Sequence, residues 1–251
     1  GCLRNGYSGG RMRRNDVETK TAILSGASSG IGRKIAKTLC RLGYEVYGFG
    51  RNFSTTEIND KNFHPVVCDL LDTAMLLSEL KKITAQGDVK LLINNAGAAY
   101  YGLHEELNPG KIAQMVRTNL EVPMILTQQL LRGLKRQKGT IINISSVTAS
   151  QANPHGCAYG ATKAGISSFT KSLFEEARKY GVRVASICPD MTKTELYRNA
   201  DFTVGEEVES YLLPEEVAQA VEFILNQREG LVVTELTLRP QLHRIQKKKG
   251  V

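Results

Sequence analysis

A tyrosine and a lysine stand four positions apart in the string Tyr-Gly-Ala-Thr-Lys at 159–163. On a helix this spacing puts both side chains on one face, so the Tyr159 phenol and the Lys163 ammonium can enter the same site. A phenol, with a pKa of about 10, is a poor base at neutral pH, and a nearby ammonium favours the phenolate. Ser145 and Ser146 end a strand-like run upstream, where a hydroxyl can meet the phenol. The Tyr–Lys pair alone is also a common pattern on helix surfaces.

A glycine-rich string, Ser-Gly-Ala-Ser-Ser-Gly-Ile-Gly at 25–32, lies between an apolar run and a helical pattern. Its three glycines have separate uses: Gly26 permits a tight turn, Gly30 lets the backbone approach a pyrophosphate, and Gly32 permits close helix packing. The helix N-terminus then offers amide donors and the positive end of its dipole to phosphate groups. An ordinary strand–helix turn is the alternative. In this position, the string favours a dinucleotide site.

The second strand-like run continues through Tyr-Gly-Phe-Gly-Arg-Asn at 47–52 and carries no acidic residue there. Sites for NAD place Asp or Glu at this point, about 20 residues after the glycines, to bind the ribose 2′-hydroxyl. Arg51 can instead pair with a 2′-phosphate through its planar fork of donors, and Arg33 is a weaker second partner. Two solvated surface arginines are the alternative. The missing acid favours NADP(H).

Short apolar runs alternate with longer amphipathic stretches from Thr21 onward. The strand-like runs are 21–25, 45–48, 64–68, 90–93, 139–144, 183–188 and 231–236. The helix-like stretches are 31–41, 75–86, 109–138 (whole or broken), 159–180 and 214–226. This alternation predicts an α/β fold, a single doubly wound Rossmann-type domain over 21–238 with about seven parallel strands and helices on both faces. The irregular stretch 190–213 follows a strand, where a substrate loop is expected.

The chain has 251 residues and a net charge of +8, and the excess charge lies at its ends. Residues 1–20 carry five basic and two acidic side chains, and residues 239–251 carry five basic ones and no acidic one. The body between them is therefore neutral, which is a weak case for a nucleic-acid surface. We interpret 1–20 as a flexible basic extension and 239–251 as a basic, flexible tail. No nucleic-acid partner is expected.

Composition also bounds the compartment. No stretch approaches the roughly 18 consecutive apolar residues of a membrane helix, and residues 1–20 lack the apolar middle of a signal peptide. The five cysteines include no close pair and the four histidines form no cluster, so we expect neither a disulfide framework nor a metal site. These features predict a cytoplasmic protein with reduced thiols and no membrane partner.

Taken together, these residues resemble the short-chain dehydrogenase/reductase family from about Thr21 to Leu238. Asn-Asn-Ala-Gly at 94–97 is similar to a family motif, and Ser146 lies thirteen positions before Tyr159, a spacing that the family shows. Asp190 stands where the family usually has glycine. The resemblance implies cofactor contacts at Gly26, Ser28, Ser29, Gly30, Ile31, Gly32, Arg51, Asp69, Leu70, Asn95, Ala96, Gly97, Tyr159, Lys163, Pro189 and Thr194.

The resemblance also implies roles. Tyr159 would be the general acid/base on the carbonyl or alcohol oxygen, and Ser146 would hold that oxygen. Lys163 would bind the nicotinamide ribose and lower the pKa of Tyr159, while Asn119 would support a water that relays protons. The expected activity is hydride transfer between NADP(H) and a small carbonyl or alcohol substrate, such as a 3-hydroxy acid, ketone or aldehyde. Residues expected near that substrate are Val147, Gln151, His155, Met191, Tyr197 and Tyr101.

Two other functions compete with this one. A catalytically idle cofactor-binding sensor or scaffold of the same fold has no physical need for both Tyr159 and Lys163, and a nucleic-acid binder is disfavoured by the neutral body. The family resemblance further implies a homotetramer or homodimer, in which the long helices near 109–138 and 159–180 pair across a two-fold axis. Phe169, Leu173 and Phe174 can serve that contact or the internal core.

Overall fold

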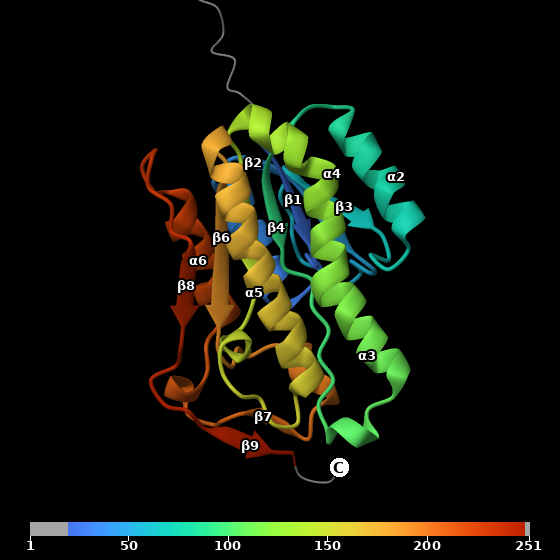
Figure 1. Cartoon of the computed structure of the whole chain (residues 1–251), viewed down its shortest axis with the longest axis vertical. Coiled ribbons are helices and arrows are strands. Elements are labelled where there is room, and N and C mark those ends of the chain that lie inside the picture. Colours follow the sequence, from blue (N-terminus) through green and yellow to red (C-terminus); the bar gives the residue numbers. More distant parts are fainter. Residues whose placement is uncertain (1–19, 249–251) are drawn as a thin grey trace, which may run out of the picture.

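The computed structural model describes residues 20–248, which are built around a seven-stranded, all-parallel sheet (Figure 1). Its strands are β1 (Lys20–Ser25), β2 (Tyr44–Gly50), β3 (Phe63–Val67), β4 (Val89–Asn94), β5 (Thr140–Ile144), β6 (Arg183–Pro189) and β8 (Glu235–Leu238). The spatial order is β3-β2-β1-β4-β5-β6-β8. The predicted doubly wound sheet is therefore confirmed.

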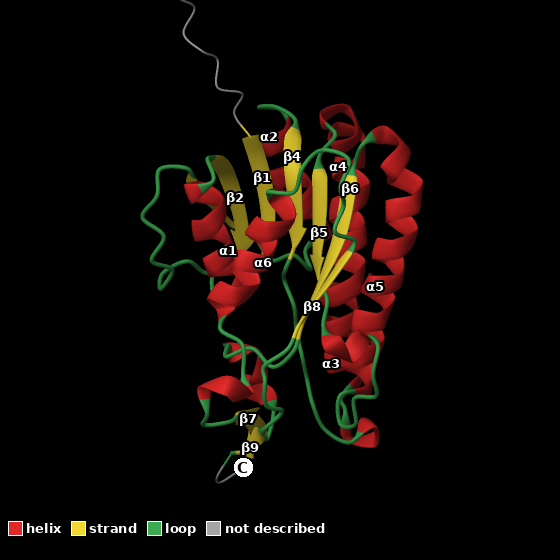
Figure 2. Cartoon of the chain, turned by 90° about the vertical axis from the view of Figure 1, so that its left-hand side faces the viewer, coloured by secondary structure: helices red, strands yellow, loops and turns green. Residues whose placement is uncertain are grey.

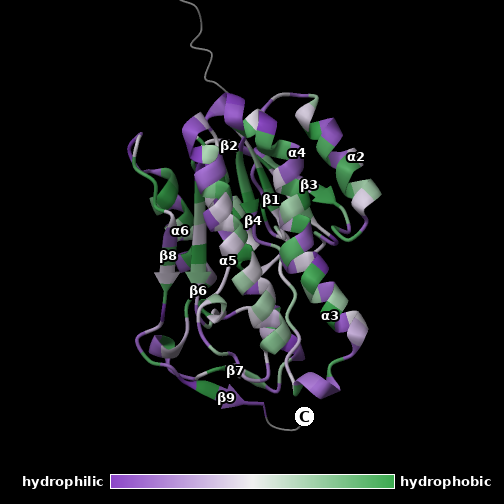
Figure 3. Ribbon diagram, viewed as in Figure 1, coloured by the Kyte–Doolittle hydropathy of each residue, from purple (hydrophilic) through white to green (hydrophobic). Residues whose placement is uncertain are grey.

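Five helices cover the two faces of the sheet (Figure 2). Helices α1 (Gly30–Arg41) and α6 (Pro214–Leu225) pack on one face, and α2 (Thr73–Thr84), α4 (Val122–Gln137) and α5 (Cys157–Ala177) pack on the other. Successive side chains of β4 alternate between these layers, because Leu91 and Ile93 join the α1–α6 core whereas Leu92 joins the opposite one. Figure 3 shows the resulting concentration of hydrophobic residues along the central strands. Within the described chain, no helix combines the length and the apolar character of a membrane span.

The strand order reverses between β1 and β4. From β1 the chain builds outward through β2 to β3, and from β4 it builds the other way through β5, β6 and β8. The connections that leave the carboxyl ends of β1 and β4 therefore diverge, which opens a crevice at this switch point. In Figure 1 the arrowheads mark that edge, at the lower side of the sheet.

The predicted long helix at 109–138 is interrupted. It consists of α3 (Pro109–Val116), a five-residue π turn (Arg117–Glu121) and α4. Pro123 lacks the amide hydrogen that would serve the Asn119 carbonyl in a regular α-helix, so the local hydrogen-bond ladder must change here. The interruption places Asn119 inside the π turn.

Two short strands lie beyond the carboxyl edge of the sheet and were not predicted. β7 (Phe202–Val204) belongs to the substrate loop 190–213, and it pairs antiparallel with β9 (Ile245–Lys247) (Figure 2). Residues 239–248, expected to belong to a flexible tail, contain β9, while 1–19 and 249–251 lie outside the described residues. Strands of three residues pair through backbone groups far apart in sequence, so they leave no periodic pattern.

Candidate active site

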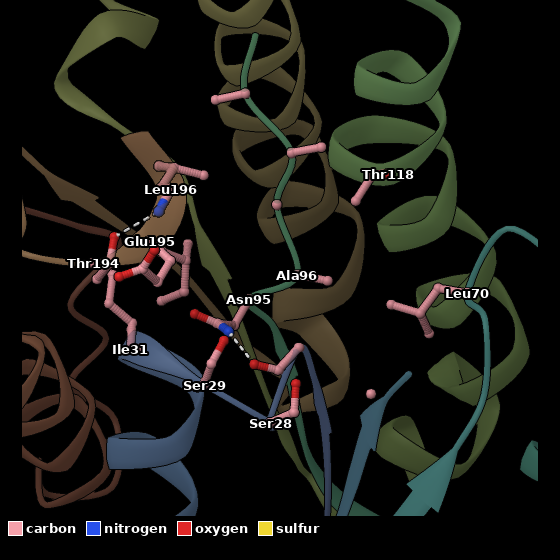
Figure 4. Close-up of a pocket in the computed structure, with 18 of the residues that line it drawn as sticks. Ser28, Ser29, Ile31, Leu70, Asn95, Ala96, Thr118, Thr194, Glu195 and Leu196 are labelled. Carbon is pink, nitrogen blue, oxygen red and sulfur yellow. Dashed lines mark hydrogen bonds between the residues drawn. The ribbon is translucent and has the colours of Figure 1, made fainter. Parts of the chain in front are cut away.

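A pocket occupies the switch point, and residues from both halves of the sheet line it. Of the predicted site residues, those lining it are Gly26, Ser28, Ser29, Gly30, Ile31, Gly32, Arg51, Asp69, Leu70, Asn95, Ala96, Gly97, Ser146, Tyr159, Lys163, Pro189 and Thr194. Asn119 is buried behind the lining. Figure 4 shows Ser28, Ser29 and Asn95 on one side, with Thr194 and Leu196 near Ile31.

The glycine loop is held against the end of β4 by two side chains. Ser25 Oγ accepts hydrogen bonds from the amides of Asn95 (3.0 Å) and Ala96 (3.1 Å). Asn95 Nδ2 donates to the carbonyl of Gly26 at 3.0 Å. A side chain at Gly26, whose φ is +70°, would place Cβ 2.8 Å from Ala96 Cα, and one at Gly32 would overlap the Gly26 carbonyl. The sequence therefore requires glycine at both positions, to keep the loop against β4 and α1.

The N-terminus of α1 presents donors to this pocket. In the described chain, the N-cap residue Ser29 makes no side-chain cap bond, and the first turn contains no acidic residue. The first amides of an α-helix have no partner within the helix. Gly30, Ile31 and Gly32 line the pocket at this point, so their backbone forms a cradle of the kind that binds pyrophosphate. A dinucleotide therefore fits the residues present.

Arg51 and Arg33, the two predicted 2′-phosphate partners, occupy different surroundings. Arg51 lines the pocket after β2, is exposed, and makes no hydrogen bond or ion pair to any described residue. Arg33 does not line the pocket, and its Nε is buried without a hydrogen-bond partner among the described residues. Its charge acts on α6, where it assists the hydrogen bond from Lys34 in lowering the pKa of Glu215. Of the two, Arg51 alone stays a candidate for the 2′-phosphate.

Tyr159, Ser146 and Lys163 lie together at the inner end of the pocket. All three are buried, at 5%, 8% and 4% exposure. Burial raises the pKa of the Tyr159 phenol, nearby Tyr197 raises it further, and a hydrogen bond with Ser146 opposes the shift. Ser146 Oγ also accepts the amide hydrogen of Thr148 at 3.2 Å. The arrangement keeps a protonated phenol and a hydroxyl side by side at neutral pH.

Lys163 lies near the Tyr159 ring and is held by the main chain of β5. Its ammonium lies 5.7 Å from the centre of the Tyr159 ring and donates to the carbonyl of Ile144 at 2.9 Å. Burial lowers the pKa of Lys163 itself to about 8. Helical spacing shows a shared face but not the depth of burial, and desolvation is the largest cause of the pKa shift in both groups.

Ser145, the alternative serine, has a structural position. Its Oγ donates to the carbonyl of Lys163 at 3.1 Å and lies 2.7 Å from Ser167 Oγ. These bonds tie the end of β5 to α5 and occupy the hydroxyl. Ser146 is therefore the serine whose hydroxyl lies beside the phenol.

The Asn119 side chain is fully engaged by its neighbours. Oδ1 accepts the amide hydrogen of Ala98 at 2.8 Å, and Nδ2 donates to the Ala98 carbonyl at 2.8 Å and to Thr162 Oγ1 at 3.0 Å. It therefore fixes the segment after β4 against α5, three residues from Tyr159. Because Pro123 provides no amide hydrogen, the main-chain carbonyl of Asn119 lacks its regular α-helical donor.

Asp190 and the substrate loop form the outer side of the site. The Asp190 side chain is 7% exposed, its Oδ1 accepts the amide hydrogen of Met191 at 2.8 Å, and its Oδ2 lies 4.0 Å from Arg239. Of the six residues expected near a substrate, Tyr197 lines the pocket, and Tyr101 contacts Tyr159 with ring centres 5.8 Å apart. The other four do not line it: Val147, Gln151, His155 and Met191.

Sequence reasoning missed Phe202, which completes a cluster of aromatic rings. Tyr101, Tyr159, Tyr197 and Phe202, here called the aromatic cluster, come from three separate segments. Ring centres are 4.9 Å apart for Tyr101 and Phe202 and 5.7 Å apart for Tyr197 and Phe202. Burial raises the pKa of Tyr197 to about 12. No signal near Phe202 in the sequence indicates this, because one of its ring partners, Tyr101, lies 101 residues upstream and only the fold brings the two rings together.

Within residues 20–248, no three His, Cys, Asp or Glu side chains are placed to hold a metal ion. Cys40, Cys68, Cys157 and Cys188 are free thiols.

Comparisons with known proteins agree with this geometry. The family model described as short chain dehydrogenase matches residues 20–203. An uncharacterized oxidoreductase of Staphylococcus epidermidis is 32% identical over 89% of this chain and 98% of its own length. A 3-oxoacyl-(acyl-carrier-protein) reductase of Escherichia coli is 33% identical over 73% of this chain and 78% of its own length. The solved structure of an alcohol dehydrogenase from Thermococcus sibiricus, complexed with 5-hydroxy-NADP, gives a TM-score of 0.79 at 27% identity, covering 90% of this chain and 98% of that one.

Proposed function

The chain belongs to the short-chain dehydrogenase family, and on that premise we propose that it is an NADP(H)-dependent oxidoreductase of small carbonyl and alcohol compounds. The observation that carries the proposal is the buried group of Tyr159, Ser146 and Lys163 at the inner end of a pocket whose other end is a phosphate cradle. Burying an ammonium-bearing side chain and a phenol costs stability. A catalytically idle sensor gains nothing from these three groups at one place that would offset this cost.

In this proposal the residues of the pocket divide the cofactor between them. The α1 amides at 30–32 hold the pyrophosphate, Asp69 and Leu70 lie at the adenine end, and Pro189 and Thr194 lie at the nicotinamide end. Lys163 and Tyr159 hold the nicotinamide ribose. When bound, the cofactor supplies or accepts the hydride.

The chain's own residues handle the substrate oxygen and the proton. The Ser146 hydroxyl donates a hydrogen bond to the carbonyl oxygen and orients it. The Tyr159 phenol, protonated at neutral pH because burial raises its pKa, donates its proton to that oxygen during reduction. Lys163, with a pKa of about 8, is suited to return a proton to the Tyr159 phenolate. A water held by the main-chain carbonyl of Asn119 would connect Lys163 to solvent.

NADP(H) is favoured by the charge at the end of β2. Arg51 is exposed at the pocket rim and unpaired among the described residues, and no carboxylate stands there to repel a 2′-phosphate. Two structures similar to this chain are described with NADP-type ligands: the Thermococcus sibiricus enzyme, and a metagenomic short-chain oxidoreductase that is 26% identical with a TM-score of 0.75. Free thiols are typical of cytoplasmic proteins, so the proposal includes a cytoplasmic location.

A substrate screen tests this function. NADPH oxidation is measured with a panel of small ketones, aldehydes and 3-oxo esters, and NADP reduction with the matching alcohols and 3-hydroxy acids. We expect turnover with at least one carbonyl compound. If NADPH binds but no panel member is turned over by the native chain, the idle sensor becomes the better account.

A further inference from the structure

We propose that residues 239–248, here called the C-terminal segment, are part of the substrate site. They hold the substrate loop 190–213 in the position that sets Tyr197 and Phe202 against Tyr101, whose ring contacts Tyr159. The inference rests on the proposed function only for the role of Tyr159 as the reacting group.

Backbone hydrogen bonds join the C-terminal segment to the loop over its middle part. β9 pairs antiparallel with β7, with Phe202 opposite Lys247. The Lys248 amide donates to the Asp201 carbonyl at 2.7 Å, and the Leu242 amide donates to the Glu209 carbonyl at 2.9 Å. The segment therefore fixes both ends of the stretch 201–209.

Gly205 lies close both to its own loop and to the C-terminal segment. A Cβ on Gly205 would lie 2.5 Å from Ser210 Oγ and 3.1 Å from the Arg244 carbonyl oxygen. Glycine is the residue that lets two chains come this near without a side chain between them.

The charges of the two stretches are complementary. Residues 201–209 carry four acidic side chains and no basic one, whereas residues 239–248 carry four basic side chains and no acidic one. Arg244 Nη1 contacts both carboxylate oxygens of Glu207 at 2.6 and 2.7 Å, and Gln246 Nε2 donates to Glu206 Oε1 at 2.9 Å. Exposed pairs contribute little stability one at a time. Arg244 and Gln246 hold the neighbouring residues Glu207 and Glu206, which adds to the register that the backbone pairing sets. The basic end of the chain thus has a partner within the same molecule.

Lys248 connects the C-terminal segment to the pocket directly. Its ammonium donates to the main-chain carbonyls of Tyr197 at 2.8 Å and Arg198 at 3.2 Å. These carbonyls belong to the short helix Glu195–Asn199, near whose end a cation is favoured. Tyr197 lines the pocket and takes part in the aromatic cluster. Lys248 is therefore a positioning residue for Tyr197.

The other end of the C-terminal segment reaches the opposite side of the site. Arg239 Nη2 donates to Gln151 Oε1 at 3.1 Å, and Arg239 Nη1 lies 4.0 Å from Asp190 Oδ2. Gln151 follows β5 and Asp190 follows β6. The segment thus joins the stretch after β5 to the loop 190–213, which it contacts at Asp190 and again over 197–209. Loosening it must loosen the side of the pocket that faces the substrate.

Hydrogen exchange of the protein without cofactor or substrate tests the first half of the inference. The double variant Arg244→Ala/Lys248→Ala removes both side-chain anchors, and Lys247→Ala, which removes an exposed charge from the same strand, is the matched control. We expect amide exchange over 195–204 to rise by about tenfold or more in the double variant, with α5 and β5 unchanged. Lys247→Ala should behave as the native chain. Lys248→Arg, with Arg244 kept, should retain the native protection that Lys248→Ala loses.

Turnover of ethyl acetoacetate, a 3-oxo ester, with NADPH tests the second half. The double variant should raise KM for this probe by about tenfold while kcat changes much less, because positioning is lost and the reacting groups stay in place. Unchanged exchange over 195–204, or raised exchange with an unchanged KM, would overturn the inference. If the native chain reduces neither this probe nor any carbonyl of the panel, the proposed function fails, and the exchange result still decides whether the segment holds the loop.

Discussion

Burial acts on the two central side chains in opposite directions: it raises the pKa of the Tyr159 phenol and lowers that of the Lys163 ammonium to about 8. Both shifts favour the uncharged forms. For Tyr159 the result is a proton donor suited to carbonyl reduction. For Lys163 it is an ammonium that is buried at a cost in stability.

That cost predicts that Lys163→Met stabilises the protein at pH 7 while abolishing turnover. The folded pKa of about 8 lies below the ordinary value of 10.5, so between these values the unfolded state binds more protons and stability rises with pH. Below pH 8 the native state carries the full cost, about 3 kcal/mol, and losing the bond to Ile144 offsets about half of it. Thermal unfolding should show Tm raised by a few degrees at pH 7 and a smaller gain at pH 10. A lower Tm at pH 7 would contradict the cost.

Arg51→Ala should remove the preference for NADPH. A charge-assisted hydrogen bond to a 2′-phosphate is worth about 1.5–3 kcal/mol, which is about one to two decades in affinity. Specificity constants for NADPH and NADH measure the effect. Arg33→Ala is the matched control, because Arg33 does not line the pocket and should leave the ratio unchanged. If NADH already equals NADPH in the native chain, or if Arg51→Ala keeps the preference, Arg51 does not select the cofactor.

At the scale of single residues, the sequence predicted which side chains meet but not how deeply they are buried. Tyr159 and Lys163 share one face of α5, and Ser146 lies beside them, as their spacing indicated. The burial that raises the pKa of Tyr159 could not be predicted, because desolvation depends on everything packed around the phenol. Arg33 likewise carries the right charge but lies outside the pocket lining.

The element that joins the two halves of the site is the rod α3–π turn–α4. Asn119 in its π turn makes three hydrogen bonds to Ala98 and Thr162. Asn119→Ala would leave the buried amide and carbonyl of Ala98 without their partner. We expect about 2–4 kcal/mol lower free energy of unfolding in urea, and a lower kcat because the segment after β4 moves. Asn119→Asp keeps the acceptor for the Ala98 amide and should lose less stability than Asn119→Ala. Equal stability of the native chain and both variants would exclude this role of the Asn119 side chain.

At the scale of elements, long periodic segments were predictable and short paired ones were not. The seven sheet strands and the main helices followed from apolar runs and helical spacing, although β8 begins at Glu235, later than the predicted 231. β7 and β9 depend on pairing between residues about 40 positions apart. The acidic composition of 201–209 and the basic composition of 239–248 are the sequence features that could have indicated this pairing.

The whole molecule gathers residues from distant stretches at one edge of the sheet. The reversal between β1 and β4 places the glycine loop beside the ends of β4 and β5, and α5 then brings Tyr159 to the same pocket. Motif order and strand–helix alternation were enough to predict this architecture, because connections between parallel strands follow one hand. The position of the C-terminal segment follows from no such rule.

We predict a homotetramer or homodimer for the assembled protein. Leu173 belongs to the internal core and Phe169 and Phe174 pack against it, so these residues are not by themselves the contact. Val116 and Met124, exposed by 42% and 37%, are apolar positions on α3 and α4 that remain available. Light scattering at micromolar concentration measures the mass, and a monomer would contradict the prediction.

The most direct test of the central claim, that the molecule acts on a carbonyl or alcohol through the Tyr159 proton, is the kinetics of Tyr159→Phe. This change removes one hydroxyl and keeps the ring within the aromatic cluster. With the best substrate of the panel, kcat should fall by about 10²–10⁴-fold while NADPH affinity, measured by direct titration, stays within about twofold. Turnover that stays near the native rate in Tyr159→Phe would contradict the account.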